Sequence, residues 1–329
     1  MIEEFEVHRP RMFGLAYRML GSVTEAEDIV QDAYLRWSGT EPGSVSCPGA
    51  WLAKVVTNLC LNRLTAARAT REDYVGSWLP EPVPTGALGP LETAEQRDCV
   101  SMAFLVLMER LTPAERAVFV LREAFGYGYR EIAEVLDLSE AGCRQLCRRA
   151  RQRVGEHGEP GEHGEPGERG EPGERRGLRE LRRFDAPGGQ RRLIVERFLK
   201  AAENGDLEGL ERLLAADVIA WADGGGKVSA ARRPVLGREK VLRYVAGLAA
   251  RFGALGQDGR GETRIVEVNG QDAIVMLLAG QVFTVSVVEV AGGEVVGLRS
   301  VANPDKLSRF AELAGLAEPV EPVEPVEPA

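Results

Sequence analysis

The stretch that most constrains the fold runs from Tyr129 to Val154 and reads YREIAEVLDLSEAGCRQLCRRARQRV. Its helical periodicity predicts a short helix with Ile132 and Val135 on the apolar side, a break around residues 137–138, and a second helix. Ser139 is placed to cap the second helix, because its hydroxyl can accept a hydrogen bond from a free amide at the helix start. Two helices joined by a tight turn are typical of a helix-turn-helix.

The second helix of this stretch carries five arginines against one glutamate, Glu140, which gives a local net charge of +4 (five minus one). Positive charge gathered on one helix is typical of a surface that binds nucleic-acid phosphates. A solvated, arginine-rich surface helix is the alternative that this stretch alone leaves open. The arginines are Arg144, Arg148, Arg149, Arg151 and Arg153.

The length of 329 residues predicts two or three domains, and 44% apolar with 28% charged residues is typical of a soluble globular chain. The net charge of −9 still allows one basic helix to bind DNA, because much acidic excess follows Gly155 and Leu316. No apolar run approaches the roughly 18 residues of a membrane span. The acidic N-terminus does not resemble a signal peptide, so we expect a cytoplasmic protein without membrane contact.

The five cysteines are odd in number, form no C-x2-C pair and are not clustered with the three histidines. We therefore expect neither a metal site nor a cofactor. Cys143 and Cys147 lie one helical turn apart on the basic helix and are predicted to be small buried side chains rather than a redox pair.

The segment TEAEDIVQDAYLRW, residues 24–37, predicts an amphipathic helix that begins with a capping box of Thr24 and Glu27. Its polar face is left for solvent or for a basic partner. That face carries Asp28, Gln31 and Asp32.

The next helix, AWLAKVVTNLCLNRLTAARATRE, interleaves aromatic and amide groups with positive charge, which suits single-stranded nucleic acid. An ordinary helix with arginines near its C-terminal end is the alternative reading. The side chains of interest are Trp51, Lys54, Asn58, Asn62 and Arg63.

Residues 77–90 are too rich in proline and glycine for a regular element and predict a linker or draped loop. Helical periodicity then returns, and Thr112, Pro113 and Glu115 form a strong helix-start signal. Seven Gly-Glu-x triplets follow from 155 to 175 and predict a disordered spacer rather than a collagen helix.

Beyond residue 191 the pattern predicts an α+β domain, because helices are followed by a meander of antiparallel strands. The two-residue turn Gly292-Gly293 predicts a hairpin between the last two strands. The expected helices span 193–202, 207–214 and 238–251, and the expected apolar and β-rich runs span 218–221, 263–268, 273–278, 282–290 and 295–301.

Residues 1 to about 154 resemble an extracytoplasmic-function sigma factor. AEDIVQDAYLRW is similar to the region-two helix that docks on core RNA polymerase, and AWLAKVVTNLCLNRL to the segment that melts and reads the minus-ten element. The helix-turn-helix resembles region four, which reads the minus-thirty-five element. WLPEP, DGGGK and NPDKL together resemble the sigma-J-like subgroup, whose C-terminal extension is a SnoaL-like cone or barrel.

The resemblance implies an alternative sigma factor, not an enzyme, with core RNA polymerase and duplex and melted promoter DNA as its partners. It implies polymerase contacts at Asp28, Gln31 and Asp32. The minus-ten contacts that it implies are Trp51, Lys54, Asn58, Asn62 and Arg63. In region four, Arg144 and Gln145 are expected at base edges, and Arg148, Arg149 and Arg151 at phosphates, beside the cap Ser139.

The C-terminal motifs are expected to contact the sigma regions, the WLPEP linker or polymerase, and so to modulate activity in cis. DGGGK can alternatively cradle an anion. Asp217, Asp223, Asp258 and Asp272 are the acids available to an enzyme, and most are expected to be solvated. The expected regulatory contacts are Trp78, Pro80, Asp223, Gly225, Lys227, Asn303, Pro304, Asp305 and Lys306.

Two other classes of function stay open: a ligand-sensing helix-turn-helix regulator, and a SnoaL-type enzyme tethered to a DNA-binding module. The predicted division of the chain is region two at 1–76, the WLPEP linker at 77–94, region four at 95–154, the Gly-Glu-x linker at 155–190, the SnoaL-like regulatory domain at 191–315, and a disordered EPV tail at 316–329.

Overall fold

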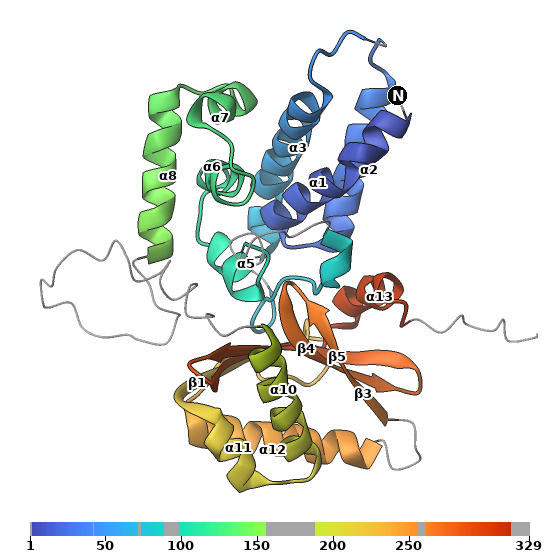
Figure 1. Ribbon diagram of the computed structural model, residues 1–329, viewed down its shortest axis with the longest axis vertical. Coiled ribbons are helices and arrows are strands. Elements are labelled where there is room, and N and C mark those ends of the chain that lie inside the picture. Colours follow the sequence, from blue (N-terminus) through green and yellow to red (C-terminus); the bar gives the residue numbers. More distant parts are fainter. Residues whose placement is uncertain are drawn as a thin grey trace, which may run out of the picture.

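The computed structural model describes residues 2–41, 43–71, 74–88, 99–155, 188–255 and 261–316. Most of the predicted triplet linker and nearly all of the predicted EPV tail lie outside these residues. A helical part and an α+β part lie one above the other in Figure 1. The described residues of the WLPEP linker run between them. None of the described helices combines the length and the apolar character that crossing a membrane requires.

The helical part begins with α1 (Ile2–Leu20), α2 (Val23–Ser38) and α3 (Pro48–Arg71). The predicted Thr24–Glu27 capping box is wrong, because Ser22 caps α2 by accepting a hydrogen bond from the Glu25 amide at 3.2 Å. The Glu81 carboxylate, far along the chain, accepts hydrogen bonds from the Ser22 hydroxyl (2.7 Å) and the Val23 amide (2.7 Å). A long-range contact therefore selects the residue at which this helix begins.

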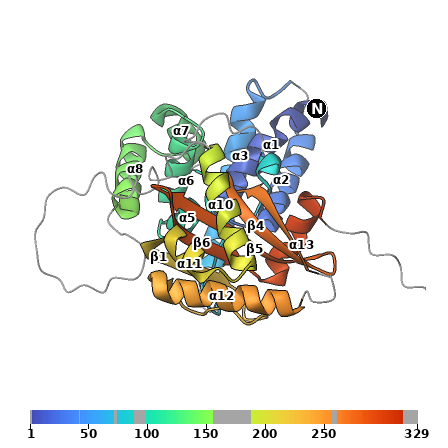
Figure 2. The same ribbon diagram turned by 60° about the horizontal axis from the view of Figure 1, so that its bottom comes forward.

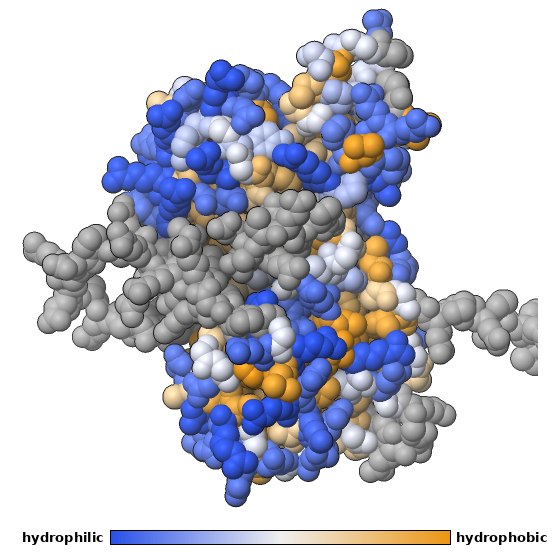
Figure 3. All heavy atoms as spheres, viewed as in Figure 1, coloured by the Kyte–Doolittle hydropathy of each residue, from blue (hydrophilic) through white to orange (hydrophobic). Residues whose placement is uncertain are grey.

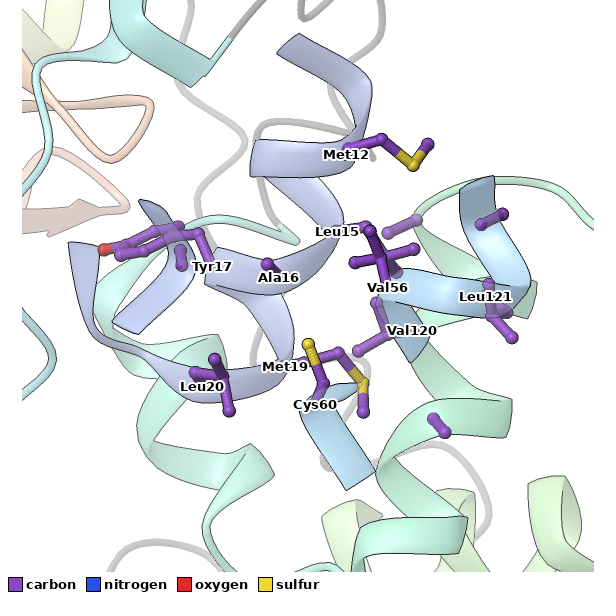
Figure 4. Close-up of a cluster of buried hydrophobic side chains, with 14 of the residues drawn as sticks. Met12, Leu15, Ala16, Tyr17, Met19, Leu20, Val56, Cys60, Val120 and Leu121 are labelled. Atoms are coloured by element: carbon purple, nitrogen blue, oxygen red, sulfur yellow. The ribbon is translucent and has the colours of Figure 1, made fainter. Parts of the chain in front are cut away.

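The second helical block consists of the 3-10 turn η1 (Thr85–Leu88), α5 (Met102–Met108), α6 (Pro113–Glu123), α7 (Tyr129–Leu136) and α8 (Glu140–Gly155). The predicted start of α6 is confirmed, since Thr112 and Glu115 form a reciprocal capping box with Pro113 at the first turn. Both helical blocks contribute to one hydrophobic core. Figure 4 shows α1, α3 and α6 meeting there through Met12, Leu15, Met19, Val56, Cys60, Val120 and Leu121.

The C-terminal part begins with α10 (Gly188–Glu203), α11 (Leu207–Leu213), β1 (Leu214–Asp223), β2 (Val235–Leu236) and α12 (Arg238–Leu255). It continues with β3 (Gly261–Val268), β4 (Gln271–Leu278), β5 (Gln281–Ala291), β6 (Glu294–Val301) and α13 (Pro304–Leu313). The α+β fold class is confirmed. The predicted apolar run at 218–221 is the centre of β1.

The six strands form one sheet in the order β2-β1-β6-β5-β4-β3, in which only the β1–β6 pairing is parallel. Helices α10, α11 and α12 cover one face of this sheet, as Figures 1 and 2 show. The other face packs on α13 and on Leu79 and Met102, which precede the C-terminal part in the chain. The C-terminal domain is thus joined to the rest of the molecule through a continuous apolar layer.

Three hairpins of the described sheet have two-residue turns in which both residues adopt positive φ, the geometry that matches the twist of the flanking strands. The predicted Gly292-Gly293 turn is confirmed, with φ of 59° and 87° and Ala291 opposite Glu294. The other two turns were not predicted: Asn269-Gly270 between β3 and β4 has φ of 53° and 74°, and Ala279-Gly280 between β4 and β5 has φ of 51° and 76°.

Candidate nucleic-acid interface and interdomain contacts

The helix-turn-helix prediction for 129–154 is confirmed by local geometry. Asp137 ends α7 in the left-handed region with φ of 54°, and the Ser139 hydroxyl accepts a hydrogen bond from the Gly142 amide at 3.1 Å. Cys143 and Cys147 are buried, as predicted, on the side of α8 that packs on the core. This packing turns the opposite side of α8 outward.

The outward side of α8 carries Arg144, Gln145, Arg148 and Arg149, all exposed. Arg144 forms an ion pair with Glu140 at 2.8 Å, and its guanidinium carbon lies 5.4 Å from the centre of the Tyr129 ring. Figure 3 shows a hydrophilic surface over α8. The exposed arginines of α8 therefore lie between positions 144 and 149, with Arg144 paired to Glu140 of the same helix.

The other two arginines of the helix are paired with α6. Arg151 meets Glu123 at 2.7 Å, and Arg153 meets the buried Glu115 at 2.5 Å. The sequence-based sum of +4 counted only Glu140, and these two glutamates lower the local charge. Arg151 was predicted to bind phosphate, but here its guanidinium is held by a carboxylate.

The polar face of α2 lies where the periodicity predicted. Asp28, Gln31 and Asp32 are exposed, opposite the buried Ile29 and Ala33. Three acceptor-bearing side chains on one open helix face can contact a basic protein surface.

Of the α3 side chains predicted to contact the minus-ten element, some pack against other residues and some are exposed to solvent. Asn62 is exposed and Asn58 and Arg63 are half-buried, whereas the Trp51 ring lies 5.6 Å from Trp37. The Lys54 ammonium donates hydrogen bonds to the Asp137 carboxylate (2.6 Å) and to the Glu134 carbonyl (3.0 Å). Lys54 therefore joins the proposed minus-ten helix to the turn of the helix-turn-helix.

Asp223, expected as a regulatory contact and also considered as a catalytic acid, is fully buried. Its Oδ2 accepts hydrogen bonds from the Lys306 ammonium (2.7 Å) and the Leu79 amide (2.9 Å), and its Oδ1 from the Tyr74 hydroxyl (2.6 Å) and the Gly225 amide (3.0 Å). A buried carboxylate is tolerated when it is paired and fully hydrogen-bonded. Asp223 is buried because the strand end that carries it is covered by the linker.

Lys306 and Asn303 complete this buried cluster from the start of α13. The Lys306 ammonium also donates to the Leu79 carbonyl at 2.5 Å and lies 4.6 Å from the centre of the Trp78 ring. The Asn303 amide donates to the Tyr74 hydroxyl at 3.0 Å. Burial, followed by the hydrogen bond to the Asp223 carboxylate, raises the pKa of Tyr74, so this hydroxyl stays a donor.

The remaining motif residues surround the cluster. A side chain at Gly225 would collide with the side-chain amide of Asn303. The exposed Lys227 and Asp305 form an ion pair at 2.6 Å, beside the exposed Pro304. The Gly225 amide and Lys227 are thus both occupied by carboxylates of the chain itself, which leaves the anion-cradle alternative without support. Trp78 and Pro80 pack against Gly21 at the end of α1.

Sequence reasoning missed Asn269, which is fully buried at the tip of the β3–β4 hairpin. Its Oδ1 accepts from the Val83 amide (3.0 Å), and its Nδ2 donates to the Tyr17 hydroxyl (2.7 Å) and the Val100 carbonyl (2.8 Å). One side chain thereby joins the C-terminal domain to region two, the linker and the start of the second helical block. The Asn-Gly dipeptide signals a tight turn, but nothing in the sequence identifies its partners.

A second missed contact links α13 to α2. The Arg309 guanidinium forms two hydrogen bonds with the Glu27 carboxylate, at 2.6 and 2.8 Å, and also meets Glu312. This pair lies on the helix that carries Asp28, Gln31 and Asp32.

The other acids considered for catalysis differ in their surroundings. Asp217 is exposed, and Asp272 lies 3.3 Å from Arg192 with its pKa raised mainly by burial. Asp258 lies outside the described residues. Within the described part of the chain, no three His, Cys, Asp or Glu side chains are grouped so that they could hold a metal ion.

The comparisons with known proteins agree with this geometry. The family models "Sigma-70 region 2" and "Sigma-70, region 4" match residues 5–70 and 101–154. ECF RNA polymerase sigma factor SigJ of Mycobacterium tuberculosis is 36% identical over 316 residues, 93% of each chain. Probable ECF RNA polymerase sigma factor SigI of the same species is 30% identical over 221 residues, 67% of this chain and 68% of the relative.

The crystal structure of M. tuberculosis SigJ matches with a TM-score of 0.69 and 34% identity, covering 93% of this chain and 98% of that one. Two helical blocks in this order, the second with a basic helix-turn-helix, define a sigma factor that directs transcription. The chain belongs to the ECF RNA polymerase sigma factors, and it carries a C-terminal α+β domain as the SigJ match does.

Proposed function

We propose that the C-terminal domain regulates this sigma factor in cis by holding the linker between regions two and four. The observation that carries the proposal is the buried Asp223 carboxylate, which accepts hydrogen bonds from Leu79 of the linker, from Tyr74 just before the linker, and from Lys306 of the C-terminal domain. Asn269 adds a second attachment at Val83. Moving the linker requires breaking a buried, charge-assisted network.

The held arrangement is incompatible with reading both promoter elements. Lys54 of the proposed minus-ten helix and Asp137 of the helix-turn-helix are 2.6 Å apart. The two promoter elements lie about 25 base pairs apart, which is roughly 85 Å at about 3.4 Å per base pair. Regions two and four must separate before both can bind, so the contacts that keep them together oppose promoter binding.

We assign the partners and residue roles accordingly. Core RNA polymerase binds Asp28, Gln31 and Asp32. The minus-ten strand is contacted by Asn58, Asn62 and Arg63. Trp51 and Lys54 join these contacts after regions two and four have separated. Arg144 and Gln145 read bases of the minus-thirty-five element, while Arg148, Arg149 and, after release from Glu123, Arg151 bind phosphates. The sigma factor acts in the cytoplasm without catalysis of its own.

The test is promoter-dependent transcription by core RNA polymerase with the full-length chain. Lys306→Met removes the buried ammonium, and Lys227→Met removes the exposed ammonium of the neighbouring motif as a matched control. We expect Lys306→Met to raise transcript yield at limiting core, with Lys227→Met close to the wild type. Equal yields from all three proteins at equal folded concentration would refute regulation by this contact.

Binding measurements on the isolated protein separate the proposal from the alternative of a ligand-sensing DNA-binding regulator. A sigma factor should bind promoter duplex weakly until core polymerase is added, because polymerase supplies much of the affinity. Tight duplex binding that core does not improve would favour the other class.

A further inference from the structure

Arg18 of α1 is an exception among the buried cations of this protein. Four buried residues of the described ranges carry a lysine or arginine side chain. Three of these side chains, those of Arg116, Arg299 and Lys306, meet a carboxylate at 2.5–2.9 Å. The described residues offer Arg18 no carboxylate: its Nη1 donates a hydrogen bond to the Gly14 carbonyl of its own helix at 3.0 Å, and its Nε has no hydrogen-bond partner.

The Arg18 guanidinium is buried between the two sigma regions. The residue is 4% exposed, and its guanidinium carbon lies 5.2 Å from the centre of the Phe125 ring, which follows α6 of region four. A Cβ on Gly14 would be 2.8 Å from Nη1 of Arg18 and 3.5 Å from the Leu88 carbonyl oxygen, so the linker lies on the same side of α1. Region four and the linker therefore both cover a cation that belongs to region two.

The Phe125 ring compensates this charge less well than a carboxylate would, because its attraction for a cation is weaker than the cost of removing the cation from water. The ring is also shared, since the guanidinium carbon of the exposed Arg11 lies 5.7 Å from its centre. Burial lowers the pKa of Arg18 to about 10, so the charged form is less stable here than in water but is still the one present at neutral pH. The closed arrangement, in which regions two and four are in contact, therefore contains a buried charge without adequate compensation.

Separation of the two regions would return Arg18 to water. Phe125 leaves α1 together with region four, and Leu88 belongs to the linker that the proposed function releases. The cost of burying the charge is therefore present in the closed arrangement and absent from the open one. A cost confined to one of two states shifts the equilibrium toward the other state. The ion pair of Lys54 with Asp137 and the Asp223 cluster act in the opposite direction.

We propose that Arg18 destabilises the closed arrangement and thereby sets how readily core RNA polymerase can open this sigma factor. This role rests on the proposed function, in which regions two and four separate before promoter binding. It is a regulatory role that needs no contact of Arg18 with DNA or polymerase. Replacing the charge by an apolar side chain should strengthen the closed arrangement, which is the opposite of what removal of a stabilising buried contact does.

The experiment measures how much core RNA polymerase half-saturates the full-length sigma factor, together with the urea midpoint of each variant. Arg18→Met keeps most of the side-chain stem and removes the charge, whereas Arg18→Lys keeps a buried charge. The control, Arg9→Met, removes an exposed charge from the same helix. Lys306→Met, which breaks the Asp223 cluster, provides a second background that favours the open arrangement.

We expect Arg18→Met to need about tenfold more core for half-saturation, because the apparent affinity falls with the fraction of open protein. Its urea midpoint should rise, since the folded protein no longer buries an uncompensated charge. Arg18→Lys and Arg9→Met should raise neither quantity. In the Lys306→Met background the effect of Arg18→Met on the core requirement should become much smaller, because less closed protein remains to be stabilised.

Three results would overturn the proposal. One is a core requirement that Arg18→Met leaves unchanged or lowers. Another is a urea midpoint that does not rise in Arg18→Met, because burial of the charge would then cost nothing. The third is an equal loss of core affinity in the wild-type and Lys306→Met backgrounds, which would assign Arg18 to direct contact with polymerase.

The Lys306→Met background also separates the role of Arg18 from the proposed function. If Lys306→Met lowers the core requirement and Arg18→Met does not raise it, the C-terminal domain still regulates in cis and the role of Arg18 alone is wrong. If both variants keep the wild-type core requirement, the proposed function fails and the role of Arg18 fails with it.

Discussion

Lys306 and Lys227 offer a direct measure of what burial does to an interdomain ion pair. Both ammonium groups belong to motifs of the C-terminal domain, and both meet an aspartate at about the same distance, 2.7 and 2.6 Å. Their side chains differ in exposure, 10% for Lys306 and 54% for Lys227. Methionine keeps most of the side-chain stem in each position, so the substitutions chiefly remove charge and hydrogen bonds.

The magnitudes follow from the surroundings of the partner carboxylates. Lys306→Met leaves the Asp223 carboxylate buried and without its cation, a change that costs about 3–5 kcal/mol for buried pairs. It also leaves the Leu79 carbonyl without one donor. Lys227→Met removes an exposed pair, for which about 0–1 kcal/mol is typical because water and salt screen the charges.

The assay is equilibrium unfolding in urea, together with hydrogen exchange at the Leu79 amide, which donates to Asp223. Lys306→Met should lower the urea midpoint clearly and speed Leu79 exchange, whereas Lys227→Met should change both only slightly. The reasoning is refuted if the two variants shift the midpoint equally, or if Leu79 exchange is unchanged in Lys306→Met.

Three further results are expected. Asn269→Ala should cost about 1–3 kcal/mol in urea unfolding, because one buried donor and two acceptors lose their partner, and an unchanged midpoint would contradict this. Arg309→Glu and Glu27→Arg should each weaken protection of α13 from hydrogen exchange, and the double exchange should restore it; failure of that rescue would exclude a direct pair. Arg144→Ala should reduce discrimination between minus-thirty-five sequences, whereas Arg148→Ala should weaken all sequences and lower the salt slope by about 1, and the reverse pattern would exchange their roles.

Much of the local structure of this protein could be predicted from the chain alone. The Thr112 capping box, the Ser139 cap and the Gly292-Gly293 turn depend on residues at most three positions apart. The burial of Cys143 and Cys147 follows from helical periodicity. The order of the motifs also identified the family and the α+β extension, because each motif is a short run of neighbouring residues.

Only part of the interdomain site could be predicted from the sequence. DGGGK, NPDKL and WLPEP stood out as motifs, but the burial of Asp223 depends on the linker that covers it, 144 residues away at Leu79. The same is true of Asn269, whose amide reaches Tyr17 across 252 residues. No periodicity or spacing rule connects residues so far apart.

Tertiary contacts also decided points that the local sequence pattern did not. The pattern predicted Thr24 as the cap of α2, but the Glu81 carboxylate binds the Ser22 hydroxyl and the Val23 amide, and Ser22 is the cap. Arg148 and Arg151 are both arginines of α8 that were predicted to bind phosphate, yet Arg151 is the one that pairs with the carboxylate of Glu123. Backbone propensity and helix capping act over a few residues, so they can be predicted from the local sequence. Burial and charge pairing depend on which surfaces the folded chain brings together, so they are decided by the tertiary structure.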